Sequence, residues 1–137
     1  MDESSLSTVM RPVKVVCVRG QPVASQVSRE RGDTMTFVGI VNAVGQSISP
    51  LFIIPRCRWN PTFMRNMMFG SKGILNPNGW MNGECFVQTL QHLLEKSGSS
   101  LENKILLIMD NAECYMNIHV VEYAIKHGIA TKIYQLS

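Results

Sequence analysis

The sequence predicts a single α/β domain built around a mixed β-sheet. Three stretches carry this prediction: a β-rich hairpin at 34–55, a helix-like apolar stripe at 82–96, and a short apolar run at 105–109 that ends in an acid. The chain has 137 residues, enough to bury one core of two or three layers. Its hydrophobic fraction of 45% and charged fraction of 17% are typical of a globular domain.

Charge and composition exclude some classes of protein and leave others open. The formal net charge of +3 permits a polyanionic partner without requiring one. The N-terminus is acidic and polar, and no apolar run reaches the length of a membrane helix, so we expect an intracellular protein without a membrane partner. The cysteines contain no C-x-x-C pair, which favours buried thiols over a zinc site or disulfides. They are Cys17, Cys57, Cys85 and Cys114.

The first third of the chain predicts a weakly ordered start, a short strand and a connection. Residues 2–8 are polar and serine-rich, and composition alone predicts a frayed terminus. Residues 14–18 contain β-branched side chains closed by Arg19-Gly20, which predicts a strand and a turn. Residues 25–33 are polar and are expected to form a connection.

A hairpin and a long connection follow. Residues 34–43 and 48–55 are rich in β-branched and aromatic residues and flank a turn containing Gly45, which predicts an antiparallel hairpin. Pro50 has no N–H to donate, so the second strand is expected at a sheet edge or at a bulge. Residues 56–79 show no sustained period and predict a long irregular excursion, which is often functional in a compact domain.

Two helices are predicted in the second half. The first begins at an Asn82 cap and ends near Lys96, and the second begins at Asn117 and ends before Gly128. Apolar side chains recur at helical spacing in both. The predicted buried faces consist of Phe86, Leu90, Leu93 and Leu94 in the first helix and of Ile118, Val121 and Ile125 in the second.

The run at 105–109 predicts a strand buried on both faces, as in a parallel sheet. Asp110 and Asn111 follow directly, at the carboxyl end of the strand, where ligands and metals bind in open α/β sheets. A turn or a helix cap is the alternative role for Asp110. Residues 129–136 predict a last strand. The element order gives a mixed sheet with helices on its faces.

Five motifs in a fixed order carry a resemblance to a known family. They are DESSLSTV at 2–9, ERG at 30–32 with Thr36, GIVNAVGQSISPLFIIPR at 39–56, NPNGWM at 76–81 and LIMDN at 107–111. Together they resemble the catalytic domain of the pogo/Tigger/jerky group of DDE transposases, relatives of centromere protein B. The resemblance implies a ribonuclease H-like fold, with residues 1–137 as one partial catalytic domain, truncated at both ends and with its first strand largely missing.

The resemblance also implies chemistry and location. It identifies Asp2 and Asp110 as catalytic acids and metal ligands of a two-metal site for Mg²⁺ or Mn²⁺, used for phosphodiester hydrolysis and strand transfer on DNA. It implies a nuclear protein with DNA as its partner and no small-molecule cofactor. The family's third acid would lie beyond Ser137, so the isolated chain is expected to be inactive.

Some residues and functions keep an alternative interpretation. Candidate contacts to DNA phosphates are the basic pairs Arg29, Arg31, Arg56 and Arg58. Such charges are equally consistent with solvated loops. Trp59 and Trp80 are candidates for stacking on bases, although Trp80 before a helix favours a packing role. The alternative functions are a domesticated or degenerate module that binds DNA or protein without catalysis, and an unrelated α/β module for a small ligand.

Overall fold

A computed structural model describes residues 1–9, 16, 19–20 and 32–134 of the chain. Apart from Val16, the strand expected at 14–18 lies outside these residues. Most of the connection expected at 25–33 lies outside them as well, and so do Cys17, Arg29 and Arg31.

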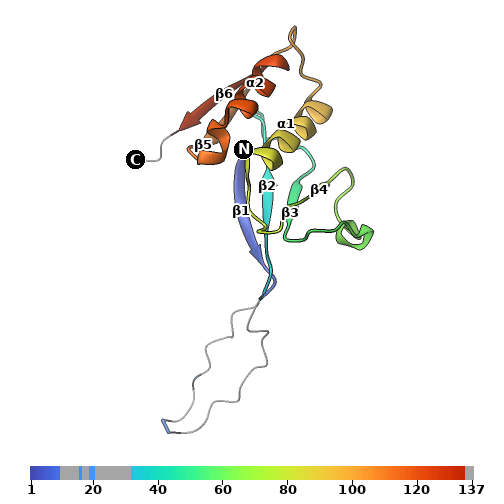
Figure 1. Ribbon diagram of the computed structural model, residues 1–137, viewed down its shortest axis with the longest axis vertical. Helices are drawn as coiled ribbons and strands as arrows, with labels where there is room; N and C mark the ends of the chain where they lie inside the picture. Colours follow the sequence, from blue (N-terminus) through green and yellow to red (C-terminus); the bar gives the residue numbers. More distant parts are fainter. Residues whose placement is uncertain (10–15, 17–18, 21–31, 135–137) are drawn as a thin grey trace.

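A four-stranded mixed sheet forms the first half of the molecule (Figure 1). Its strands, in spatial order, are β1 (Asp2–Ser7), β2 (Thr34–Gly39), β3 (Leu51–Ile54) and β4 (Lys72–Leu75). Strands β1 to β3 pair antiparallel, which confirms the hairpin, and β4 pairs parallel to β3. A second sheet contains the parallel strands β5 (Ile105–Asp110) and β6 (Ile129–Tyr134). The predicted mixed α/β architecture is confirmed.

Three features of the four-stranded sheet differ from expectation. β1 is a paired strand and not a frayed end, because backbone pairing to β2 over six residues is indifferent to its serine side chains. Pro50 lies just before β3, whose place inside the sheet rules out an edge position, and the Pro50 carbonyl accepts from Lys72 N at 3.1 Å. β4 forms within the excursion expected to be irregular, which also contains a 3₁₀ turn, η1 (Pro61–Met64).

The first helix, α1 (Gly83–Ser97), agrees with its predicted cap and face. The Asn82 side chain accepts from Cys85 N at 2.9 Å, and Gly98 ends the helix in the left-handed region with a φ of 65°. Phe86, Leu90 and Leu93 are buried as expected.

The second helix, α2 (Ile118–Lys126), is capped by Asn117 as predicted but turns a different face inward. Its buried residues are Val120 and Ala124, whereas Ile118, Val121 and Ile125 are exposed. The prediction of the buried face was wrong because apolar residues occupy adjacent faces of this short helix, so that periodicity does not single one out. A 3₁₀ turn, η2 (Glu113–Met116), joins β5 to α2.

Both helices pack on one face of the sheets. The larger buried cluster joins α1 and α2 to Leu107 and Met109 of β5, and the smaller one joins Cys85 of α1 to β2, β3 and β4. Leu106 and Ile108 point to the opposite face and are 63% and 48% exposed. β5 is therefore buried on one face only, which corrects the expectation of two. We call the face opposite α1 and α2 the open face.

In the part of the chain that the structure describes, no helix is long and apolar enough to cross a membrane.

Candidate active site

The two predicted acids lie at the junction of the two sheets. The N-terminal amine of Met1 donates to the carbonyl of Ile108 at 2.8 Å, which ties the start of β1 to β5 near the chain's N-terminus in Figure 1. The charges of Asp2 and Asp110 both raise the pKa of Glu3, so the two carboxylates lie near the same side chain. The two acids that the sequence singled out therefore lie in one region of the molecule, at the junction of the two sheets.

Strand alternation places both acids on the open face. Met109 is buried against the helices, and Met1 packs against the same cluster. Because successive side chains on a strand point to opposite faces, the neighbouring Asp2 and Asp110 point away from the helices, and both are exposed.

The two acids differ in how they are held. Asp110 ends a strand that pairs with β6 over its full length and buries Leu107 and Met109. Asp2 is the first residue of its strand, opposite Gly39, and one of its carboxylate oxygens accepts from Glu3 N at 2.8 Å. The position of Asp2 thus depends on a few contacts at the chain end.

Glu3 supplies one of these contacts and was not singled out from the sequence. The Tyr115 hydroxyl donates to Glu3 Oε1, across 112 residues of chain. The Tyr115 ring is buried against Phe86, with ring centroids 4.5 Å apart. The missed signal was alternation: in a strand starting at Asp2, residue 3 must face the helices.

Burial and nearby charges shift the pKa values of Glu3 and Tyr115. Burial raises the pKa of Glu3 above its ordinary value, the hydrogen bond from Tyr115 lowers it, and the charges of Asp110 and Asp2 raise it further. Burial and the hydrogen bond to Glu3 raise the pKa of Tyr115. Tyr115 therefore keeps its proton near neutral pH and acts as the donor that anchors β1 to η2.

The acid pair fits a hard divalent cation in part. Mg²⁺ is commonly held by one or two carboxylates together with water and substrate phosphates, and Mn²⁺ accepts the same oxygen ligands. Among residues 1–9, 16, 19–20 and 32–134, no group of three or more His, Cys, Asp or Glu side chains could hold a metal ion. Asp2 and Asp110 thus offer a two-carboxylate platform.

A shallow cavity of about 290 Å³ adjoins Asp2. Its lining includes Asp2, Ser4, Phe37 and Gly39, from the first two strands. The sheet surface beside the acid is therefore hollowed rather than covered.

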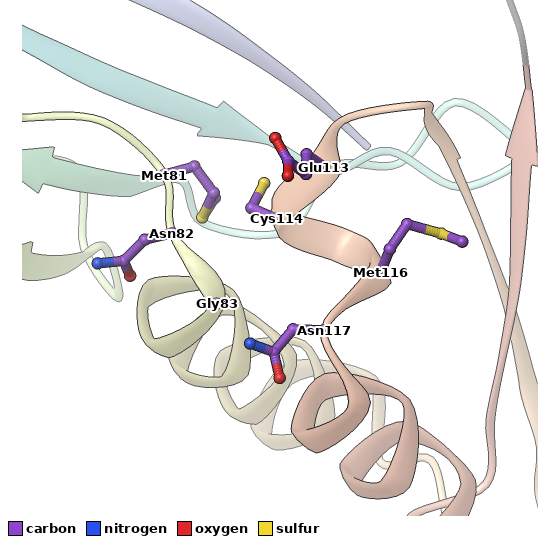
Figure 2. Close-up of a pocket in the computed structure, with 7 residues that line it drawn as sticks. All are labelled: Met81, Asn82, Gly83, Glu113, Cys114, Met116 and Asn117. Atoms are coloured by element: carbon purple, nitrogen blue, oxygen red, sulfur yellow. The ribbon is translucent and has the colours of Figure 1, made fainter.

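A larger cavity, of about 720 Å³, lies between the start of α1 and the η2–α2 connection (Figure 2). Asn82 and Asn117 line it but already cap their helices. Burial, with a smaller contribution from Glu3, raises the pKa of Cys114 to about 11, so its thiol stays protonated near neutral pH and is a poor nucleophile. This cavity therefore lacks an activated group for catalysis.

The candidate DNA contacts separate into different environments. Arg56 pairs with Asp33 at 2.5 Å and donates to the Pro55 carbonyl at 2.7 Å, so its charge is compensated. The hydrogen bond and charge of Asp33 raise the pKa of Arg56. Arg58 is exposed and has no carboxylate partner among the described residues.

The tryptophans are both accessible. Trp59 is 50% and Trp80 57% exposed, so the packing role favoured for Trp80 is not what the structure shows.

Cys57, Cys85 and His92 differ in exposure and in their hydrogen bonds. Cys85 is buried as expected, whereas Cys57 is exposed, which corrects the prediction for that thiol. His92 is buried, with its Nε2 at 2.7 Å from the Ser49 carbonyl, and so joins α1 to the loop before β3.

Comparison with known proteins supports the fold. No family model matches the chain, and a search of curated proteins gives no match. A solved structure, the Mos1 transposase paired-end complex with left transposon end, matches with a TM-score of 0.53 and 17% identity over 95% of this chain. The match covers 33% of that transposase chain, so this chain spans about a third of its length. At this identity the likeness shows the fold alone: a mixed α/β, ribonuclease H-like fold, as in a transposase catalytic domain.

Proposed function

We propose that this chain is the core of a DDE transposase catalytic domain of the pogo type, acting on DNA in the nucleus. The observation that carries the proposal is that the strands bearing Asp2 and Asp110 are tied by the Met1 contact to Ile108, and that both acids act on the same side chain, Glu3. The order of the five sequence motifs and the fold shared with the Mos1 transposase support it.

The chain's own residues supply ligands and position them. A divalent cation bound here would neutralise phosphate charge and lower the pKa of a water or 3′-hydroxyl nucleophile. Asp2 and Asp110 provide carboxylate oxygens from two separate sheets. The Met1 contact to Ile108 and the Tyr115 contact to Glu3 hold those sheets in register.

We further propose that the isolated chain binds metal weakly and hydrolyses DNA slowly or not at all. Two carboxylates form the described platform, whereas the DDE chemistry implied by the motifs uses three. A degenerate, non-catalytic derivative is the second candidate function, and the same two-acid platform favours it.

The test is a titration of the full chain with Mn²⁺, in which electron paramagnetic resonance measures the amount of bound ion. We expect one class of weak sites that Asp110→Asn and Asp2→Asn each weaken by about tenfold or more, the size of effect typical of altering a metal's surroundings. Glu113→Gln, an exposed acid three residues after Asp110, is the matched control and should bind Mn²⁺ like the wild type. Equal affinity in Asp110→Asn and wild type would contradict the proposed site.

A Mn²⁺-dependent nicking assay on duplex DNA separates the two candidate functions. Cleavage that disappears in Asp110→Asn supports a residual nuclease. DNA binding without cleavage, unchanged in Asp110→Asn, supports the non-catalytic derivative.

A further inference from the structure

We propose that the connection between β3 and β4 carries a binding surface for single-stranded nucleic acid. The surface, called here the β3–β4 surface, consists of Arg58, Trp59, Arg65 and Phe69. The choice of nucleic acid as the polyanion rests on the proposed function. The location of the surface rests on charge, exposure and packing.

Residues 34–83, which include the connection between β3 and β4, carry positive charge only. Residues 34–83 contain Arg56, Arg58, Arg65 and Lys72 but no Asp or Glu, so every acid of the chain lies elsewhere. Arg56 is neutralised by Asp33. Within the described residues the other three cations have no carboxylate partner. Of these, Arg58 and Arg65 are exposed and are therefore available to a polyanion.

A fifth cation, Lys96 of α1, lies near this connection but on the helix side of the sheet. The Nζ of Lys96 lies 3.0 Å from the position that a Cβ on Gly70 would occupy, two residues before Lys72. Gly70 itself has a φ of 81°, the left-handed region that favours glycine. Lys72 shares the helix side of β4 with the buried Ile74, so neither Lys72 nor Lys96 belongs to the β3–β4 surface.

Two exposed aromatic side chains, Trp59 and Phe69, belong to the same connection. Phe69 is 98% exposed, and Trp59 keeps half of its surface in solvent. Trp59 is nevertheless fixed. Its ring packs edge-to-face on Phe63, with ring centroids 6.1 Å apart, and one ring atom lies 2.9 Å from the position that a Cβ on Gly73 would occupy. The absence of a side chain at Gly73 makes room for this ring. A held, half-exposed indole is suited to stacking on an unpaired base.

The surface continues the face that carries the acids. Ile74 is buried on the helix side, so its neighbour Gly73 lies on the open face. Gly73 pairs with Phe52, Phe52 pairs with Phe37, and Phe37 pairs with Ser4. Ser4 lies two residues after Asp2 in β1 and therefore shares its face. Adjacent strands are about 5 Å apart, so about 15 Å separates β4 from β1. Figure 1 shows the connection at the far edge of the sheet from β1.

These features favour a single strand over other anionic partners. Stacking requires bases that are not paired, whereas a duplex would use the cations alone. An acidic protein segment would use the same cations but would show no preference for bases.

The experiment measures anisotropy of a labelled oligothymidine against the full chain at several salt concentrations. Arg58→Gln with Arg65→Gln should weaken binding and reduce the salt slope by about 1.4, from about 0.7 per phosphate contact on a single strand. Trp59→Ala should weaken binding about 5- to 140-fold. In Trp80→Phe, Trp59 is the remaining tryptophan, and its fluorescence should be quenched by the oligonucleotide.

Matched variants keep the result interpretable. Lys104→Gln with Lys126→Gln removes the same charge from exposed positions before β5 and at the end of α2, and should leave the salt slope within about 0.3 of wild type. Thermal melts verify folding, and Trp59→Phe replaces Trp59→Ala where the alanine variant unfolds. Equal loss in both double variants, tighter binding of a duplex of the same length, or no binding by the wild type would each overturn the proposal.

The two proposals fail separately. A chain that binds Mn²⁺ through Asp110 but no oligothymidine refutes the β3–β4 surface alone. A chain that binds oligothymidine through Arg58 and Arg65, while Asp110→Asn leaves Mn²⁺ binding unchanged, refutes the proposed metal site alone.

Discussion

The two sheets contribute to the candidate active site in different ways. The β5–β6 sheet supplies Asp110 at the end of a fully paired strand backed by the larger buried cluster. The four-stranded sheet supplies Asp2 at the start of β1, held to β5 through Met1 and to η2 through Glu3. The geometry of the candidate site therefore depends less on either sheet than on the contacts that join the two.

Helix α1 is the main connection between the sheets. Phe86 belongs to the larger buried cluster and touches Tyr115, whereas its neighbour Cys85 belongs to the cluster under β2 to β4. A substitution in the buried face of this helix should consequently lower the stability of both sheets.

The largest effect is expected from Phe86→Ala. Phe86 is fully buried, and removing such a ring should lower the free energy of unfolding by about 3–5 kcal/mol. Urea unfolding, monitored by both tryptophan fluorescence and circular dichroism, should measure this loss of free energy. Since Trp59 and Trp80 both lie in the β3–α1 region, coincident transitions would show that the two sheets unfold together.

Ile125→Gln is the matched control for that variant. Ile125 is apolar but 68% exposed on α2, so the free energy of unfolding should change by no more than about 0.5 kcal/mol. Two separate transitions in Phe86→Ala, or a large loss in Ile125→Gln, would contradict this description of the core.

A smaller effect is expected from Tyr115→Phe, which removes the donor to Glu3 and keeps the ring. Leaving the half-buried carboxylate without this partner should cost about 1–3 kcal/mol of unfolding free energy. Mn²⁺ affinity should fall as well, because Asp2 loses the tether one residue away. Denaturation and Mn²⁺ titration measure the two effects separately.

Tyr134→Phe removes an exposed hydroxyl opposite Asp110 in the β5–β6 ladder and should change neither quantity. Reduced stability with unchanged Mn²⁺ affinity in Tyr115→Phe would show that the Glu3 contact is structural only.

Sequence patterns located the parts of the fold that depend on local signals. The Asn82 cap, the stripe of α1 and the turn at Gly45 are each encoded within a few residues, and each was predicted correctly. β1 and β4 were missed because their pairing is supplied by distant strands and not by their own side chains.

The candidate site was predictable to a similar extent. Motif order singled out Asp2 and Asp110 as candidates, but the contact between Met1 and Ile108 that ties their two strands is encoded by no local pattern. The compensated charge of Arg56 depends on the register of the hairpin, which pairs Thr36 with Ile53 and so sets residue 33 opposite residue 56.

The smallest and most specific effect concerns pH. The raised pKa of Glu3 means that the folded state binds this proton more tightly than the unfolded state. Stability should therefore fall as the pH rises from the ordinary value of 4.5 through the raised folded pKa, and the loss should be complete above it. Glu3→Gln carries no such proton and should lack this component of the pH dependence.

Urea unfolding from about pH 4 to about pH 8 would measure it. Glu3→Gln should be more stable than wild type near neutral pH, and the difference should vanish in acid. Glu102→Gln, an exposed acid before β5, should follow the wild-type curve. Parallel curves for Glu3→Gln and wild type would mean that Glu3 is not desolvated against Tyr115.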